Sequence, residues 1–202
     1  MVIQYREAKA SDAKRIALLH ATSWQYAYRG VLSDEFLDND VVENRRVHWQ
    51  DRFKTPEKNQ FVLLAEEGEC IKGFFSVIGE ADERWGALLD NIHVLPEIRG
   101  QGLGTQLMNK AGTWVQSKFP QSSLHLWVFE ANYPARRFYE RLGATKEHRE
   151  VGEVTGGGTA PVLRYVWESI EPLLEYSPKE NKDRHGNNPR IHRCSPEYSC
   201  FP

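Results

Sequence analysis

The sequence predicts one mixed α/β domain, and three observations support this class. The chain has 202 residues, of which 40% are hydrophobic and 27% charged, as in a soluble globular protein. A chain of this length forms one ordinary domain and buries roughly 70% of its unfolded surface. Short apolar runs typical of strands alternate along it with longer segments whose apolar residues recur at helical spacing.

The predicted elements follow the order β-α-α-β-β-β-α-β-α-β-β. The opening segment 2–6 alternates like a strand. Ser11 and Asp12 supply a helix-capping signal, and a second cap at 33–35 precedes another helix. Two apolar runs separated by a turn with Gly68 predict a hairpin. The hairpin strands are 61–65 and 70–78, and further strands are expected at 88–94, 124–129, 146–151 and 162–167. Helices are expected at 13–20, 36–53, 102–120 and 133–142.

The apolar residues of the segment 88–94 do not keep the strict period of two that a strand with one buried face requires. Leu89 and Ile92 are three residues apart, whereas Ile92 and Val94 are two apart. A β-bulge, which inserts one extra residue into a strand, explains this spacing. A strand buried on both faces explains it equally well.

The last part of the chain, residues 171–202, has a different composition. Prolines interrupt it, and it has too few apolar side chains to offset the entropy of ordering. We therefore expect the domain to end at residue 170, followed by a disordered polar tail. The spacing of the histidines and cysteines in this tail matches no common zinc pattern, so no metal is expected; they are His185, His192, Cys194 and Cys200.

The cysteines indicate no other chemistry. Three cysteines at these spacings form no disulfide framework and no Cys-x-x-Cys pair. Cys70 lies in an apolar segment, which indicates a buried and inert thiol. We therefore expect no covalent enzyme intermediate on sulfur.

Charge and hydropathy exclude several classes of function. The 26 basic and 28 acidic residues leave a formal charge of −2, which gives no strong field to recruit nucleic acid or an anionic membrane. No apolar run approaches the roughly 18 residues that a transmembrane helix needs. The N-terminus lacks the apolar stretch of a secretory signal. We expect a cytoplasmic protein that binds neither nucleic acid nor membrane.

The segment 99–105, Arg-Gly-Gln-Gly-Leu-Gly-Thr, lies between a predicted strand and a predicted helix. Glycines let a backbone approach a ligand closely, and a helix N-terminus adds unpaired N–H groups and the positive end of a dipole. Arg99 adds a permanent charge with a geometry that suits phosphate oxygens. The segment is therefore predicted to bind a diphosphate, although glycines at this spacing also suit a simple tight connection. It matches neither a Walker loop nor a complete dinucleotide fingerprint.

This segment resembles the pyrophosphate-binding motif of the GCN5-related N-acetyltransferase (GNAT) superfamily, Arg/Gln-x-x-Gly-x-Gly/Ala. Arg99, Gly102 and Gly104 fill its fixed places. A later stretch resembles the second signature of that family, Asn-x-x-Ala-x-x-x-Tyr-x-x-x-Gly-Phe/Ala. Its fixed places are filled by Asn132, Ala135, Tyr139 and Gly143. The order of elements also matches, and the resemblance covers roughly residues 1–168.

The resemblance implies a GNAT fold in which the fourth strand carries a bulge and splays from the fifth. It also implies that the pantetheine arm of acetyl-CoA enters this gap like a missing strand. The backbone that would pair with this arm belongs to Ile92, His93 and Val94. The residues that would hold the pyrophosphate, mostly through backbone N–H groups, are Arg99, Gly100, Gln101, Gly102, Leu103, Gly104 and Thr105.

Two residues of the second signature would act nearer the reacting end of acetyl-CoA. The resemblance implies that Asn132 contacts the cofactor near the pantetheine and that Tyr139 stands by the sulfur as a proton donor. From the residues alone, Asn132 suits a helix N-cap before Pro134 equally well. Tyr139 lies on an apolar stripe at helical spacing, which is also typical of a core aromatic residue.

The acceptor side is less defined. The resemblance implies that the segment joining the first two helices lines the acceptor cavity, although aromatic rings there could equally pack the helices on the sheet. The expected substrate contacts are Trp24, Tyr26 and Tyr28. Acidic residues that could attract a cationic amine are Asp38, Asp40 and Glu43. A base must take a proton from the acceptor, because an ammonium has no lone pair. This base stays unassigned among Glu80, Asp82, Glu83, Asp90 and His93.

The sequence thus predicts an N-acetyltransferase with acetyl-CoA as co-substrate and no metal. It would move the acetyl group to a primary amine of a small molecule, peptide or protein, by direct transfer in a ternary complex. Two alternatives on the same scaffold are a transferase for another acyl-CoA and a non-catalytic acyl-CoA-binding module. Dimers are frequent in the family that the sequence resembles, so a homodimer is left open.

Overall fold

The computed structural model describes residues 2–175 of the chain. Its strands are β1 (Gln4–Glu7), β2 (Gln60–Glu67), β3 (Cys70–Asp82), β4 (Gly86–Val94), β5 (Leu124–Phe129), β6 (Thr145–Glu153) and β7 (Thr159–Trp167). Its helices are α1 (Ala13–Ala27), α2 (Val41–Lys54), α3 (Leu103–Lys118), α4 (Tyr133–Arg141) and α5 (Glu171–Glu175), with short helical turns η1 (Ala10–Asp12), η2 (Phe36–Asp40) and η3 (Pro96–Ile98). The mixed α/β class and the predicted order of strands and long helices are confirmed.

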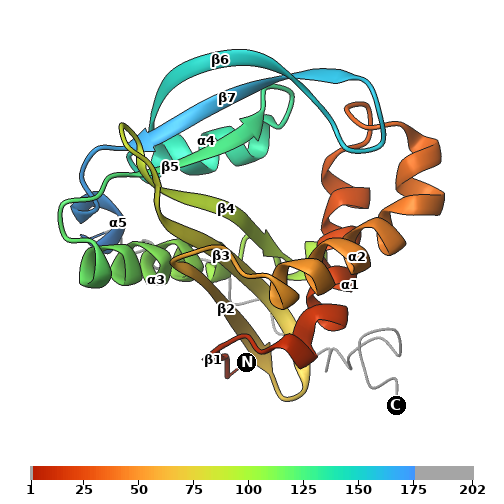
Figure 1. Cartoon of the computed structure of the whole chain (residues 1–202), viewed down its shortest axis with the longest axis horizontal. Coiled ribbons are helices and arrows are strands. Elements are labelled where there is room, and N and C mark those ends of the chain that lie inside the picture. Colours follow the sequence, from red (N-terminus) through yellow and green to blue (C-terminus); the bar gives the residue numbers. More distant parts are fainter. Residues whose placement is uncertain (1, 176–202) are drawn as a thin grey trace, which may run out of the picture.

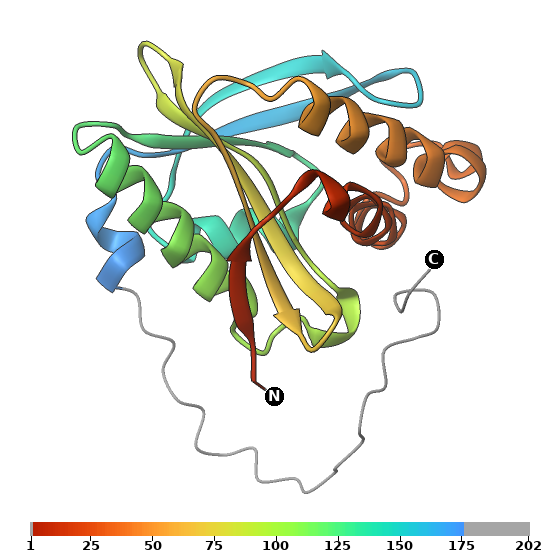
Figure 2. The ribbon, with the colours of Figure 1, turned by 60° about the horizontal axis from the view of Figure 1, so that its bottom comes forward.

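The strands form one sheet in the order β1-β2-β3-β4-β5-β7-β6 (Figure 1). Within it β4 and β5 run parallel, and every other pair of neighbours runs antiparallel. Helix α3 covers one face of the half of the sheet formed by β1 to β4, and α1 and α2 cover the other (Figure 2). The main apolar core lies between these helices and the sheet.

A second, smaller apolar cluster joins the end of α1 to η2 and the start of α2. Its buried members are Ala21, Leu32, Phe36, Leu37 and Val41, and Trp24, Tyr28 and Phe129 pack against it. The predicted cap before η2 is present, since the backbone N–H of Phe36 donates to Ser33 Oγ at 3.2 Å. The glycine loop between β6 and β7 reaches this cluster, because a Cβ at Gly156 would lie 2.5 Å from the Phe36 ring. This contact joins the far end of the sheet to the segment between α1 and α2.

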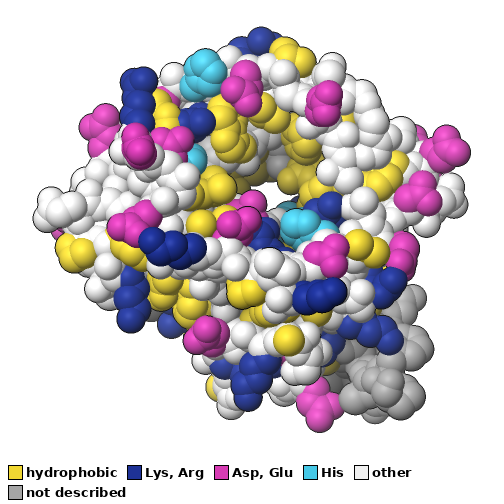
Figure 3. All heavy atoms as spheres, viewed as in Figure 1, with side chains coloured by type: hydrophobic (Ala, Val, Ile, Leu, Met, Phe, Trp, Pro, Cys, Tyr) yellow, Lys and Arg dark blue, Asp and Glu magenta, His cyan; other side chains and the backbone are white. Residues whose placement is uncertain are grey.

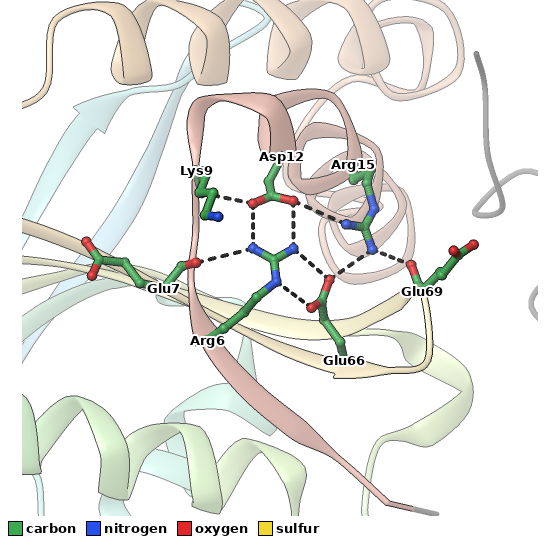
Figure 4. Close-up of polar contacts among 7 residues, drawn as sticks. All are labelled: Arg6, Glu7, Lys9, Asp12, Arg15, Glu66 and Glu69. Atoms are coloured by element: carbon green, nitrogen blue, oxygen red, sulfur yellow. Dashed lines mark hydrogen bonds and ion pairs between the residues drawn. The ribbon is translucent and has the colours of Figure 1, made fainter.

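A network of ion pairs fastens α1 to the edge of the sheet (Figure 4). Arg6 on β1 donates from Nη1 and Nη2 to both carboxylate oxygens of Asp12, at 2.7 and 2.8 Å. Its Nε donates to Glu66 on β2 at 2.7 Å, and Arg15 on α1 bonds to the same two carboxylates. Both carboxylates are buried. Asp12, predicted from the sequence as a helix cap, is therefore part of a wider network that joins β1, η1, α1 and β2.

The irregular spacing in the fourth strand comes from a β-bulge. Ser76 on β3 pairs with Asn91 on β4, but the next residue, Val77, pairs with Leu89, so Asp90 is the extra residue. Strand β4 pairs with β5 only through Ala87 and Leu88, which face 124 and 125. Beyond Leu88 the two strands separate, as the resemblance implied.

Two sequence-based expectations are wrong. Residues 171–175 are not part of a polar tail: they form α5, in which Leu173 is only 1% exposed, and Asn109 Nδ2 on α3 donates to the carbonyl oxygens of Leu173 and Leu174 at 3.2 Å. The rest of the expected tail, with its histidines and cysteines, lies outside the described residues. Cys70 is not a buried free thiol, because it is half-buried at the start of β3 and is disulfide-bonded.

The described chain contains neither a membrane-spanning helix nor a cluster of metal ligands. None of its helices is both long and apolar enough to cross a bilayer. Among residues 2–175, no three or more His, Cys, Asp or Glu side chains stand where they could hold a metal ion together.

Candidate functional site

The separation of β4 from β5 lies beside an opening in the molecular surface. Figure 3 shows this opening near the centre of the molecule, with hydrophobic side chains on its upper wall and basic, acidic and histidine side chains along its lower rim. The backbone of 92–94 pairs with β3 on one side, and no strand of the described residues pairs with it on the other. The Val94 carbonyl accepts from Arg99 Nε at 3.3 Å. The other N–H and C=O groups on the unpaired side, which have no partner in the described chain, are available to an extended ligand.

The glycine loop lies at the end of β4 and leads into α3. Gly100 and Gly102 have φ values of +78° and +88°, in the left-handed region that favours glycine. A Cβ at either position would meet nothing within 4 Å, so the space above the loop is open. The backbone N–H groups of 100–105 donate no hydrogen bond to any backbone or side-chain acceptor in the described chain. These donors and the N-terminus of the 16-residue helix α3 together suit an anionic group.

Arg99 links this loop to α1. Its Nη2 donates to Ser23 Oγ at 2.9 Å and its Nε donates to the Val94 carbonyl at 3.3 Å. The guanidinium also lies over the Tyr26 ring, 4.7 Å from its centre. Burial lowers the pKa of Arg99, which still leaves the group charged at neutral pH. A phosphate-binding role for Arg99 stays a prediction, since the side chain is turned toward α1.

Asn132 and Tyr139 lie at the two ends of α4. Asn132 Oδ1 accepts the Ala135 N–H at 3.3 Å, so the N-cap interpretation is confirmed. Tyr139 is 8% exposed, and its ring packs edge-on against Trp167 at 6.0 Å between centroids. Its hydroxyl makes no hydrogen bond within the described residues. Burial, and to a lesser extent the nearby Tyr28 hydroxyl, raise the pKa of Tyr139 well above its ordinary value.

Two of the three predicted acceptor residues lie together, and the third does not. Trp24 meets Tyr28 edge-on at 5.4 Å between centroids, and Tyr28 meets Phe129 in the same way at 4.9 Å. Burial raises the pKa of Tyr28 to about 12. Tyr26 is 66% exposed and lies under Arg99 instead. Phe129 was missed from the sequence, and its position as the last residue of β5 is the one signal that could have placed it at the strand end.

His93 points from β4 toward α1. Its Nδ1 is 2.9 Å from Ser23 Oγ, and its ring lies 4.3 Å from that of His20, which is fully buried. His20 Nδ1 in turn accepts the indole N–H of Trp49 at 3.0 Å. Burial, with smaller effects of Arg99 and Arg45, lowers the pKa of His93 to about 3. His93 is therefore neutral at pH 7 and a weak base.

Most of the acidic candidates for the base already accept hydrogen bonds from other groups of the protein. Asp90 bonds to Arg52 and Asn91. Asp82 accepts backbone N–H groups at 2.8 and 2.9 Å in the β3–β4 turn, and Glu80 accepts from an amide at 2.9 Å. The carboxylates expected to attract a cationic amine lie on the surface, where Asp38 pairs with Arg29 and Glu43 with Arg46. The base therefore stays unassigned.

Arg45, which the sequence did not single out, lies against the predicted acceptor residue Trp24. It is 7% exposed, and its guanidinium lies 4.1 Å from the centre of the Trp24 ring. Burial lowers the pKa of Arg45 to about 10. Val41, Arg45 and Trp49 recur every four residues on the buried side of α2, so a cation on an apolar stripe was the available signal.

A separate pocket of about 660 Å³ lies beside the ion-pair network of Figure 4. The charged groups of Arg6, Arg15 and Glu66 that line it bond to one another or to Asp12. Arg46, at its edge, pairs with Glu43. These groups are already neutralised, so the pocket contributes nothing to the site at the splayed strands.

The chain is similar in sequence to known acetyltransferases. The model of the acetyltransferase (GNAT) family matches residues 16–144. An uncharacterized N-acetyltransferase of Bacillus subtilis, YuaI, is 30% identical over 158 residues, which cover 77% of this chain and 87% of that protein. A probable N-acetyltransferase of Mycobacterium tuberculosis is 24% identical over 141 residues, 69% of this chain and 78% of its own length.

Solved structures share the fold at lower identity. The PaiA N-acetyltransferase of Thermoplasma acidophilum, in complex with coenzyme A, aligns with a TM-score of 0.62 and 19% identity over 83% of this chain and all of its own. YncA of Salmonella typhimurium, a putative acetyltransferase solved with acetyl-CoA, aligns with a TM-score of 0.59 and 17% identity over 90% of this chain and 99% of its own. The matching family model, the two motifs and the splayed strands agree: the chain is an N-acetyltransferase that belongs to the GNAT family.

Proposed function

We propose that this protein transfers the acetyl group of acetyl-CoA directly to a primary amine of a small molecule or peptide within a ternary complex. The observation that carries the proposal is the separation of β4 from β5 beyond Leu88, directly beside the open glycine loop. An extended arm can pair with the free edge of β4 while a diphosphate lies on the N–H groups at the start of α3.

The residues of the site fit acetyl-CoA. The unpartnered N–H groups of 100–105 and the open space above Gly100 and Gly102 suit the pyrophosphate. The backbone of 92–94 suits the two amides of pantetheine. Structures of PaiA with coenzyme A and of YncA with acetyl-CoA, which share this fold, support the same donor.

The chemistry asked of the protein is modest. The bound thioester supplies an activated acetyl group: a C–N bond forms to the amine and the C–S bond breaks. The attacking nitrogen loses one proton, and the leaving thiolate gains one to become the free thiol. The hydroxyl of Tyr139 stays protonated at pH 7 because its pKa is raised. It can therefore donate a hydrogen bond to the developing thiolate, whose conjugate thiol has a pKa of about 8.5. The same raised pKa makes complete proton transfer from Tyr139 costly, so we assign hydrogen-bond donation to it.

Release of free thiol from acetyl-CoA, measured with a broad panel of amines, tests the proposal. We expect amine-dependent release with acetyl-CoA that exceeds release with succinyl-CoA or propionyl-CoA. A faster reaction with another acyl-CoA would assign a different donor. Tight acetyl-CoA binding by calorimetry with no release for any amine would instead favour a non-catalytic binding module.

A further inference from the structure

Arg45 lies where the acceptor of the proposed reaction has to bind. It comes from the middle of α2, and its guanidinium covers the Trp24 ring at 4.1 Å. Trp24 leads through Tyr28 to Phe129 at the end of β5, with ring centroids 5.4 and 4.9 Å apart. Tyr28 also stands close enough to Tyr139 to affect its pKa. Arg45 therefore borders the aromatic wall that ends at the proposed reaction centre.

The charge of Arg45 has no counterion of its own in the described chain. Its Nε and Nη2 donate to the amide oxygen of Asn44, and no described residue accepts from Nη1. The nearby carboxylate of Asp90 is held by Arg52 and Asn91. Burying a guanidinium without a carboxylate is unfavourable, and such an arrangement is expected where a ligand supplies the missing charge.

The other ionisable groups around Arg45 do not supply that charge. His20, His48 and His93 all have lowered pKa values, because they are buried and close to arginines, so all three are neutral at pH 7. Nε2 of His20 and Nε2 of His48 are buried with no hydrogen-bond partner in the part of the chain that the structure describes. Arg99 adds a second positive group close enough to Tyr28 to affect its pKa. The surroundings of the acceptor site are thus positive.

We propose that the acceptor is an amine that also carries a carboxylate, such as an apolar amino acid, and that Arg45 binds this carboxylate. This inference rests on the proposed function. A charge-assisted hydrogen bond from Nη1 is strong in a site shielded from water. Trp24 and Tyr28 contact the apolar part of the acceptor. The positive surroundings lower the pKa of the acceptor ammonium and so favour the neutral amine that attacks. A polyamine, which brings only positive charge, does not fit.

Matched acceptors test this assignment. Thiol release from acetyl-CoA is measured for the full chain with L-phenylalanine, L-phenylalaninamide and 2-phenylethylamine, with the corresponding methionine series, and with spermidine. We expect kcat/KM for the free acids to exceed that for the amides and decarboxylated amines by about 10- to 100-fold. The amine of an amino acid amide is less basic than that of the acid. Chemistry alone therefore favours the amide, and a preference for the acid must come from binding.

Variants of α2 then identify the group responsible. Arg45→Met should bring the acid and the amide to within about 2-fold of each other, and Arg45→Lys should restore part of the preference. Arg46→Met removes the same charge from the exposed side of the helix and should keep the wild-type preference. The melting temperature of Arg45→Met should equal or exceed that of the wild type, because an unneutralised buried charge is removed.

The outcomes separate the two proposals. Amides or spermidine accepted as well as the acids, or an acid preference that survives Arg45→Met, would overturn the role of Arg45 and leave acetyl transfer intact. A large drop in the melting temperature of Arg45→Met with the acid preference unchanged would make the residue structural. No thiol release with any amine would refute the proposed function and this inference with it.

Discussion

At the scale of single residues, several side chains serve the fold and the site together. Asn132 caps α4, and Tyr139 packs against Trp167 while its hydroxyl makes no hydrogen bond within the described chain. The alternatives that the sequence left open for these residues are therefore not exclusive. A ring can be a core residue along one edge and face the substrate with its polar end.

The hydroxyl of Tyr139 can be tested without disturbing its ring. Tyr139→Phe keeps the packing and removes the hydroxyl that we propose donates to the sulfur. We expect kcat to fall by about 10- to 100-fold, at the low end for an acid catalyst, because the raised pKa limits this residue to hydrogen-bond donation. Acetyl-CoA affinity by calorimetry and the melting temperature should hardly change. A Phe variant that keeps more than half of the wild-type kcat on a good acceptor would show that Tyr139 is not needed, and that water protonates the leaving sulfur.

At the scale of elements, the candidate site is formed by the ends of helices and strands and by one unpaired strand edge. The start of α3, the free edge of β4 after its bulge, the end of β5 and the start of α4 contribute the residues of the candidate site. The start of α3 and the unpaired edge of β4 leave backbone groups without partners in the described chain, because a helix end or an unpaired strand edge cannot satisfy its own N–H and C=O groups. The start of α4, by contrast, is capped by Asn132. The local structure thus provides the ligand contacts that side chains then refine.

The start of α3 can be tested by substituting its N-cap. Gly102→Asp places a carboxylate in the open space above the loop, facing the site expected for the pyrophosphate, and strains a residue with φ +88°. We expect calorimetry to show at least about a 100-fold loss of acetyl-CoA affinity, because the added charge repels phosphate and the side chain fills the space.

Gly68→Asp is the matched control for that variant. Gly68 also has a positive φ, +60°, and open space for a Cβ, but it lies in the β2–β3 turn. It should cost similar stability and leave acetyl-CoA affinity unchanged. Equal affinities for the wild type and Gly102→Asp would remove the loop from the cofactor site.

The stability that the Asp12 carboxylate contributes to the ion-pair network of β1, β2 and α1 depends on pH. Burial alone would raise the pKa of Asp12, but the hydrogen bonds from Arg6 and the Lys9 backbone outweigh it and the pKa lies below its ordinary value. A carboxyl with a depressed folded-state pKa stabilises the protein above its unfolded pKa of about 3.9 and loses that contribution as the pH falls further. Asp12→Asn should therefore lower the free energy of unfolding by about 2 kcal/mol at pH 7.

Urea unfolding at several pH values measures this contribution. The difference between wild type and Asp12→Asn should be constant from pH 7 to about pH 5 and shrink below pH 4. A difference that stays the same down to pH 3 would show that the Asp12 charge does not stabilise α1.

At the scale of the whole molecule, the domain ends with helix α5, which the composition of the sequence did not predict. Helix α5 packs on α3, where the Leu173 Cβ would lie 3.4 Å from a Cβ at Gly112. Gly112 on α3 therefore makes room for α5. This contact lies far from the splayed strands, so it bears on stability and not on the reaction.

Leu173→Ala tests whether the packing of α5 on α3 stabilises the domain. The side chain is almost fully buried, and its truncation should lower the free energy of unfolding by about 2–4 kcal/mol through lost burial and the cavity that remains. Acetyl-CoA affinity should stay at the wild-type value. Leu174→Ala, at a partly buried neighbour, should cost clearly less. Equal melting temperatures for wild type and Leu173→Ala would restore the original domain end at residue 170.

The sequence by itself determined the family, the order of the elements and the glycine loop. These features are local: capping residues, apolar periods and the spacing of Arg99, Gly102 and Gly104 act within a few turns of chain. The tertiary structure decided which side chains meet. Pairing with β3 assigned the bulge to Asp90, and Tyr26 was separated from Trp24 and Tyr28. It also buried Arg45 beside the aromatic wall, because exposure on a helix depends on elements distant in sequence that pack against it.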